Sequence, residues 1–409
     1  MRNPNPEIIK KIQQNLEELL KTNSPEEISM RNLAQKCEIS AANIYHYYKN
    51  KEELFSSLGI AFEQPQKNQN SNFQNKNIKK NGSEGMKGIS DMMNYRPSIK
   101  VVDATLRDGG LCNDFFFPEG FAKALYEANK KAGVDYMEFG YKADKSLFDV
   151  NKFGPGKFCD DDYIRSVVGE GEHPVKVAVM ADVGRCNFKE DIHDKSESPV
   201  DLIRIAAYLH QIPAAIEMIE DAHKKGYETS CNIMALSTGQ ENDIKQALDM
   251  VGRSPVDVIY IVDSYGSIYP EEMARVCKIF NEFAEKYHKK IGIHAHDNQK
   301  LAFANTIECV GDGVDYLDAT YMQMGRGAGN CAMELLLGFL HNPKYKPYYV
   351  FQFIQDYMYS LKESGVVWGY DLQYIMTGLF NQHPRSAIAY TKDKRKDLAN
   401  FYQEVMGMD

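Results

Sequence analysis

The sequence predicts an α/β protein, a (β/α)8 TIM barrel with a C-terminal helical extension, preceded by a small all-α domain. From Ile99 onward, short apolar runs alternate with longer amphipathic runs, which is the pattern of repeated β/α units. A polar segment separates these units from a helix-rich beginning, and after residue 329 the pattern becomes helical and aromatic. A doubly wound sheet is the alternative, but eight regular units favour closure into a barrel.

Eight short apolar runs are the candidate strands, and the amphipathic stretches between them are the candidate helices. We expect strands at 99–104, 134–140, 175–181, 201–206, 228–235, 256–262, 290–294 and 314–319. We expect helices at 119–132, 211–225, 241–252, 270–288 and 299–311.

The region before the barrel is expected to form helices. Apolar residues repeat there at helical spacing, at Ile8, Ile12, Leu16, Leu19 and Leu20. The following segment is rich in Gln, Asn, Lys, Ser and Gly and poor in apolar residues, which predicts a flexible polar linker. The predicted divisions are a helical domain at 1–63, the linker at 64–97, the barrel at 98–340 and the helical extension at 341–409.

Composition favours a cytoplasmic globular protein. The 409 residues suffice for a large domain and a small one, and the net charge of −9 gives no global attraction to nucleic acid or an anionic membrane. The chain has no run of eighteen apolar residues and no signal-type apolar core, so we expect no membrane contact. Its eight cysteines show no CxxC spacing, which favours reduced thiols.

The most informative motif is His294-Ala295-His296, at the end of the apolar run that begins at Lys290. Side chains at positions i and i+2 of a strand point to the same face, so both imidazoles can reach one metal ion. Far upstream, another apolar run ends in the pair Arg107-Asp108. Two strand ends that carry charged or ligating side chains indicate a single site at one end of a parallel sheet or barrel.

Residues 29–56 resemble the helix-turn-helix of TetR-type regulators. The matching motifs are Ser29 to Ser40, Asn43 to Tyr48 and Asn50 to Leu54. The resemblance implies a second helix that enters the major groove of DNA. Its candidate groove-facing residues are Ala41, Asn43, Tyr45 and His46, with Tyr47 and Lys51 on phosphates. Acidic and basic side chains nearly balance in this region, so an assembly module is the alternative to DNA binding.

Residues 99–390 resemble the metal-dependent aldolases related to 4-hydroxy-2-oxovalerate aldolase. These belong to the DRE-TIM metallolyase superfamily, which includes hydroxymethylglutaryl-CoA lyase and isopropylmalate synthase. Five motifs carry the resemblance in the right order, and a late segment at 368–384 is also aldolase-like. The motifs are Asp103–Gly110, Met137–Lys142, Val262–Gly266, His294–Asn298 and Gly325–Asn330.

The resemblance implies a carbon–carbon lyase with a divalent metal ion held by Asp108, His294 and His296. Asn330 matches a ligand or near-ligand position, and Arg107 matches the arginine that stabilises an enolate oxygen. One carboxylate and two imidazoles suit Mn²⁺, while Mg²⁺, Co²⁺ and Zn²⁺ stay open. The implied reaction cleaves or forms a 4-hydroxy-2-oxo acid through a pyruvate-type enolate.

The chain departs from its relatives at the expected base. Related aldolases carry a histidine soon after the Arg-Asp pair, whereas residues 109–114 contain none. The base is therefore open between Tyr265, Tyr141, His383 and a metal-bound hydroxide.

Four further side chains have predicted roles. Glu138 either orients the catalytic arginine or forms a strand-end salt bridge, and Asp318 either holds a partner in the site or makes a structural hydrogen bond. Arg326 and His383 are the candidate substrate-binding residues.

Two other functions compete with the aldolase. One is a Claisen-type acyl-CoA synthase of the same superfamily, and the other is a TetR-like transcriptional regulator whose barrel senses a metabolite. The expected partners are a small 2-oxo acid, DNA at the N-terminal domain, further copies of the chain in a homodimer or larger homo-oligomer, and an aldehyde dehydrogenase.

Overall fold

The computed structural model describes residues 6–21, 28, 30–37, 39, 44, 47–48, 51–58 and 98–407. The chain splits into two compact units, Met1–Met86 and Lys87–Asp409. The predicted linker at 64–97 lies outside the described residues, so its flexibility and the four predicted domain limits stay predictions.

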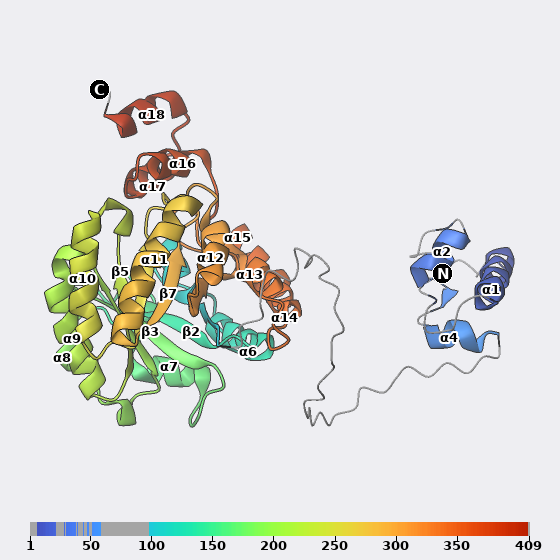
Figure 1. Ribbon diagram of the computed structural model, residues 1–409, viewed down its shortest axis with the longest axis horizontal. Helices are drawn as coiled ribbons and strands as arrows, with labels where there is room; N and C mark the ends of the chain where they lie inside the picture. The colour runs from blue at the N-terminus through green and yellow to red at the C-terminus, as the bar shows by residue number, and fades with distance from the viewer. Residues whose placement is uncertain are drawn as a thin grey trace, which may run out of the picture. The chain divides into compact units, whose positions relative to one another are not determined.

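The first unit is helical, as predicted, with helices α1 (Pro6–Leu20), α2 (Met30–Lys36) and α4 (Lys51–Ser56) (Figure 1). In α1, the repeat of apolar residues places Ile12 and Leu16 in the core, and the remaining members of the repeat are partly buried. The core also holds Ile28, Leu33, Ala34, Cys37, Ile44, Tyr48, Leu54 and Phe55.

Most of the predicted DNA contacts cannot be located in this unit. Ala41, Asn43, Tyr45 and His46 lie outside the described residues, and only the backbone of Lys51 is described, at the start of α4. Tyr47 is half-buried and packs against the core. Its predicted phosphate contact therefore stays a prediction.

The second unit contains a closed barrel of eight parallel strands, in which each strand pairs with the next along the chain and β8 pairs with β1. Each predicted strand is confirmed to within about two residues. The strands are β1 (Lys100–Asp103), β2 (Tyr136–Tyr141), β3 (Lys176–Asp182), β4 (Leu202–Ala207), β5 (Glu228–Ile233), β6 (Val258–Asp263), β7 (Lys290–Ala295) and β8 (Tyr316–Ala319).

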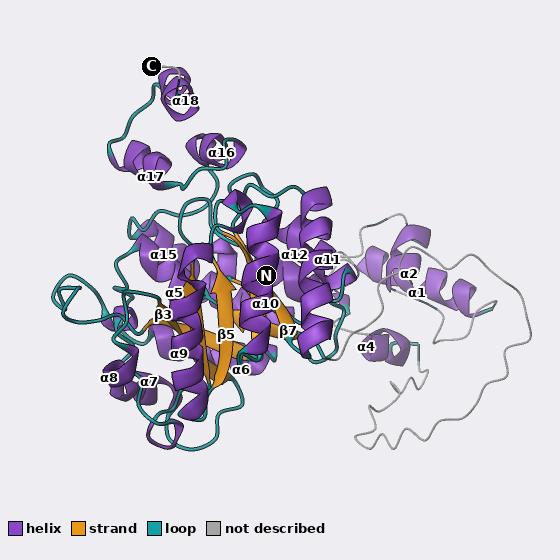
Figure 2. Cartoon of the chain, turned by 60° about the vertical axis from the view of Figure 1, so that its left-hand side comes forward, coloured by secondary structure: helices purple, strands orange, loops and turns teal. Residues whose placement is uncertain are grey.

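Helices surround the strands, as Figure 2 shows. Five match the predicted helices: α6 (Phe121–Ala132), α9 (Ile212–Lys224), α10 (Glu241–Arg253), α11 (Pro270–Tyr287) and α12 (Ala302–Gly311). Three short ones were not predicted: α5 (Thr105–Gly109), α7 (Asp161–Val168) and α8 (Phe188–Asp191). The large apolar core lies between the strands and this helical layer. No helix among the described residues is long and apolar enough to cross a membrane.

A polar cluster inside the barrel closes its amino end. Glu228, the first residue of β5, accepts hydrogen bonds from the hydroxyl groups of Tyr136 (2.8 Å) and Tyr316 (2.9 Å). These tyrosines begin β2 and β8, so all three side chains meet at the amino end of the barrel. The other end of the barrel, where the strands finish, is therefore free to hold a site.

The chain after the barrel is helical, as predicted. Its elements are α13 (Met333–Phe339), α14 (Pro347–Phe353), the π-helix η8 (Ile354–Met358), α15 (Tyr359–Glu363), α16 (Leu372–Leu379), α17 (Arg385–Lys392) and α18 (Leu398–Met406). Phe353 of α14 packs on Phe121 of α6, with ring centroids 5.2 Å apart. The last three helices share a small core with Ala328, which lies in the loop after β8. This packing brings the α16–α17 segment to the carboxyl end of the barrel.

Candidate metal centre and active site

The first part of the site is the turn of helix α5, directly after β1. The Asp103 carboxylate accepts hydrogen bonds from the backbone N–H of Thr105 (2.9 Å) and from the side chain of Asn129 (2.6 Å). Burial raises the pKa of Asp103 to about 6. The turn places Arg107 and Asp108 on a helix, so the expectation that this pair ends a strand is wrong.

Asp108, His294 and His296 meet at one point. One ligand atom from each residue lies within 4.8 Å of those from the other two, and all three side chains are buried. The two imidazole rings are 5.1 Å apart at 85°, so the i, i+2 spacing does bring them together. His296 lies just beyond β7 and pairs through its backbone with Asn330.

The Asp108 carboxylate is held on both oxygens. Its Oδ1 accepts a hydrogen bond from Arg107 Nη1 (2.7 Å), and its Oδ2 accepts from Asn330 Nδ2 (2.7 Å) and from the backbone N–H of Arg326 (3.1 Å). Burial alone would raise the pKa of Asp108, but the neighbouring His296 and His294 imidazoles and the guanidinium groups of Arg107 and Arg326 hold it well below its ordinary value. Burial also lowers the pKa of His296 well below its usual range. The pair therefore offers an ionised carboxylate and a neutral imidazole.

His294 is oriented by a carboxylate behind it. Its Nδ1 lies 2.9 Å from Oδ2 of Asp318, and its Nε2 lies 3.5 Å from Nη2 of Arg107. An Nδ1–H that donates to Asp318 leaves the Nε2 lone pair directed toward the cluster, which is the arrangement common in metal-binding histidines.

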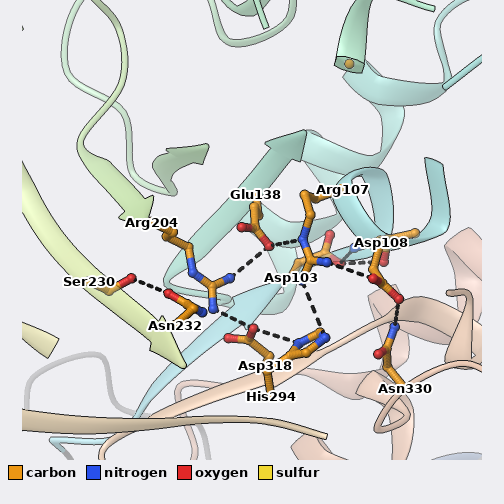
Figure 3. A network of polar contacts seen from close by, with 12 residues as sticks. Asp103, Arg107, Asp108, Glu138, Arg204, Ser230, Asn232, His294, Asp318 and Asn330 are labelled. Carbon is orange, nitrogen blue, oxygen red and sulfur yellow. Dashed lines mark hydrogen bonds and ion pairs between the residues drawn. The ribbon is translucent and has the colours of Figure 1, made fainter. Parts of the chain in front are cut away.

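A buried ion-pair chain links the two sides of the site (Figure 3). Oε2 of Glu138 accepts hydrogen bonds from Arg107 Nε and from Arg204 Nη1, each at 2.8 Å. Arg204 Nη2 donates to Oδ2 of Asp318 at 2.6 Å, and Arg204 is fully buried. Glu138 thus touches the arginine that it was expected to orient, and Arg204 couples that arginine to the carboxylate behind His294.

Arg204 was not among the residues predicted for the site. The available signal was a lone charged residue inside the apolar run Leu202–Ala207, since a charge in a buried parallel strand requires partners.

A cavity of about 330 Å³ opens beside the cluster at the carboxyl end of the barrel. The residues that line it include Arg107, Asp108, Tyr141, Lys157, Asp182, Arg185, Asn232, His294, His296, Arg326, His383 and Arg385. Glu138 and Asn330 lie behind this lining. Tyr265 does not line the cavity either, and its ring lies against His383, with centroids 5.8 Å apart.

Arg326 and His383, the candidate substrate-binding residues, lie together at the cavity wall. Nη1 of Arg326 is 3.2 Å from Nε2 of His383, and Nη2 donates to the backbone oxygen of Ser264 (3.2 Å). Burial, together with Arg326 and Arg385, lowers the pKa of His383 to about 4, so this imidazole is neutral at pH 7.

The two tyrosine candidates for the base differ in position. Tyr141 lines the cavity, and burial raises its pKa, as it also does for Tyr265. Both phenols are therefore protonated at neutral pH. The assignment of the base stays a prediction.

The closed barrel carries a carboxylate–bis-imidazole cluster at its carboxyl end, and this donor set could hold a divalent metal ion. Residues 98–358 match the HMGL-like family, and the chain belongs to that family of lyases. Residues 16–58 match the family described as bacterial regulatory proteins, tetR family.

Curated relatives match the barrel at modest identity. The oxaloacetate decarboxylase of Mycobacterium tuberculosis is 28% identical over 244 residues, which cover 59% of this chain and 69% of that protein. The 4-hydroxy-2-oxovalerate aldolase of Thermus thermophilus is 28% identical over 257 residues, which cover 63% and 72% of the two chains.

Solved structures have the same fold. The N-terminal domain of a proposed aldolase from Bacteroides vulgatus superposes with a TM-score of 0.62 at 27% identity, covering 72% of this chain and 97% of that one. The HMG-CoA lyase of Brucella melitensis has a TM-score of 0.52 at 14% identity, covering 65% of this chain and 99% of that one, which shows the fold alone.

Proposed function

We propose that the barrel is a divalent-metal-dependent aldolase that cleaves, or forms, 4-hydroxy-2-oxo acids through the enolate of pyruvate. The observation that carries the proposal is the convergence of Asp108, His294 and His296 beside Arg107. Several relatives bear the name 4-hydroxy-2-oxovalerate aldolase, which supports the choice of substrate class.

The residues of the cluster fit a divalent cation. They offer one ionised carboxylate and two imidazoles, and the Oδ1 atom of Asn330 is buried without a hydrogen-bond partner. Mixed oxygen and nitrogen donors suit Mn²⁺, our proposed ion, over Mg²⁺, which prefers oxygen, and over Zn²⁺, which prefers four ligands. When bound, such an ion would supply Lewis-acid polarisation of the 2-oxo acid.

Arg107 is the proposed stabiliser of the developing enolate. Glu138 and Asp108 hold its Nε and Nη1, which fixes the plane of the guanidinium at the cavity wall. As the bond between C3 and C4 breaks, negative charge moves onto the C2 oxygen, and a donor fixed in advance stabilises that charge without reorganisation.

The proton of the 4-hydroxyl group must pass to a base as the aldehyde forms. His383 is neutral at pH 7 and lines the cavity, whereas Tyr265 lies behind it. We therefore propose that a ring nitrogen of His383 receives the 4-hydroxyl proton after it leaves its contact with Arg326 Nη1 or with the backbone N–H of Arg385, and that Tyr265 positions the imidazole ring.

The experiment is a panel of 4-hydroxy-2-oxo acids offered to the Mn²⁺-loaded full chain, with pyruvate release followed by lactate dehydrogenase. We expect turnover of at least one member, with one aldehyde formed per pyruvate. An enzyme that is folded and metal-loaded but releases no pyruvate from any member would contradict the proposal.

Oxaloacetate decarboxylation is the second candidate, because a relative of similar identity bears that name. Loss of carbon dioxide from oxaloacetate leaves the same pyruvate enolate, so Arg107 would serve both reactions in the same way. Oxaloacetate in the same assay separates them, since decarboxylation releases pyruvate without an aldehyde.

We also propose that the TetR-like region binds DNA, which the match over residues 16–58 supports. Self-association, an aldehyde dehydrogenase partner and a cytoplasmic location stay predictions from the sequence.

A further inference from the structure

Lys157 projects into the active-site cavity from the loop after β2, where it ends the 3₁₀ turn Pro155–Lys157. Only 8% of the residue is exposed. Four aromatic rings surround its ammonium group: the Nζ atom lies 4.1 Å from the ring centroid of Phe148, 5.0 Å from that of Tyr141, 5.4 Å from that of Phe153 and 5.7 Å from that of Phe115. Two rings of this loop, together with Tyr141 of β2 and with Phe115, thus form an aromatic cage around a single cation.

This ammonium group has no anionic partner among the described residues. No described carboxylate oxygen lies within 4.0 Å of Nζ. Asp182 lines the same cavity and influences the pKa of Lys157, but it forms no ion pair with it. Arg185 adds a second positive charge nearby, and Asp114 is a further acidic neighbour that raises the pKa of Lys157 without forming an ion pair with it.

An aromatic cage compensates only part of the cost of this burial. Ring faces attract a cation only weakly in comparison with an ion-pair partner. A buried ammonium without a counter-ion loses more hydration energy than the rings return, so buried cations are normally paired. Burial accordingly lowers the pKa of Lys157, and an anion beside Nζ would reverse this effect. Because Lys157 lines the cavity, an anion that enters there can become its ion-pair partner.

The place of Lys157 in the barrel indicates which part of a substrate it would meet. Lys157 follows β2 and Asp182 ends β3, whereas Arg326 contacts Ser264, the residue after β6, which lies across the closed barrel from β2. The cluster of Asp108, His294 and His296 also faces this cavity. If the cluster and Arg107 hold the pyruvate half of a substrate, the other half can extend toward the cage.

We propose that Lys157 binds a carboxylate at the far end of the substrate, so that the preferred substrates are 4-hydroxy-2-oxo dicarboxylates. The aldehyde released from such a substrate carries that carboxylate. This inference rests on the proposed aldolase function, because it assigns the opposite end of the same substrate.

A binding experiment tests the inference without turnover. Isothermal titration of the Mn²⁺-loaded full chain compares 2-oxoglutarate with 2-oxopentanoate, which has the same chain length but a methyl group in place of the terminal carboxylate. Neither compound has a 4-hydroxyl group, so retro-aldol cleavage cannot occur. We expect 2-oxoglutarate to bind about 30-fold more tightly, the value of one charge-assisted hydrogen bond.

Substitutions of Lys157 test whether this residue causes the preference for 2-oxoglutarate. Lys157→Met and Lys157→Gln should each reduce it to less than about threefold, and Lys157→Arg should retain most of it, since a single charge-assisted contact is lost or kept. Lys152→Met is the matched control, because Lys152 lies on the same loop with 75% of its side chain exposed and should leave the preference unchanged. Equal affinity of the wild-type protein for the two compounds would overturn the inference, even if the Lys157 variants failed to fold. So would an undiminished preference in folded Lys157→Met.

Cleavage assays separate this inference from the proposed function. If 4-hydroxy-2-oxopentanoate is cleaved with a kcat/KM equal to or above that of 4-hydroxy-2-oxoglutarate, the aldolase proposal holds and the lysine proposal fails. If neither compound releases pyruvate while the binding preference depends on Lys157, the carboxylate site stands and the aldolase proposal fails.

Discussion

Replacing Arg107 with lysine would test the proposed stabilisation of the enolate. The guanidinium uses Nε and Nη1 to bind Glu138 and Asp108, which leaves Nη2 near Nε2 of His294, at 3.5 Å. Lysine keeps the charge but has a single nitrogen, which cannot bind both carboxylates and also donate to the substrate.

The expected effect of Arg107→Lys follows from the loss of one fixed donor. A donor of this kind stabilises a developing oxyanion by roughly 3–4 kcal/mol, so kcat should fall about 100- to 1,000-fold. The metal content should stay close to that of the wild-type protein, because the three proposed ligands are unchanged.

Pyruvate release at saturating substrate measures kcat, and metal analysis with thermal unfolding serves as the control. A folded, metal-loaded Arg107→Lys protein with near wild-type kcat would show that this arginine is structural and would refute the reasoning.

Three further predictions concern other parts of the chain. Asp318→Asn should weaken metal binding about 10- to 100-fold, because the carboxylate that orients His294 is lost; an unchanged metal Kd would show that the contact is incidental. Because the pKa of His383 is lowered to about 4, its contribution to folding stability should be lost as pH falls from about 6.5 through 4. In urea unfolding, the wild-type chain should therefore lose more stability over this pH range than His383→Gln, and the same pH dependence in both proteins would contradict the lowered pKa. A truncated chain that starts near Tyr95 should retain lyase activity and lose DNA affinity, which in the full chain should fall steeply as salt rises; a truncated chain that is metal-loaded but inactive would mean that the first unit is needed for catalysis.

The barrel was predictable because each of its strands can be recognised from a short stretch of sequence. Each strand is a short buried run, and the alternation with amphipathic helices repeats eight times. The turn after β1 was not predictable in the same way. There, the Asp103 carboxylate accepts from the backbone N–H of Thr105, where a short helix begins that the apolar run before it does not predict.

The candidate metal ligands were predictable because the i, i+2 spacing of His294 and His296 is a property of the strand itself. The contacts of Arg204 were not predictable, since its partners Glu138 and Asp318 lie 66 and 114 residues away along the chain. Only the closed order of the strands brings the three together. The environment of Lys157 depends equally on the fold, because its cage combines β2 with the loops around it.

Metal content tests the central proposal most directly. The wild-type chain, His294→Ala and His296→Ala would each be exposed to Mn²⁺, dialysed against metal-free buffer and assayed for bound ion, with circular dichroism to verify folding. We expect about one ion per wild-type chain, and strongly reduced occupancy and no turnover in both folded variants. Full occupancy in both variants would contradict the assignment of Asp108, His294 and His296 as the metal site.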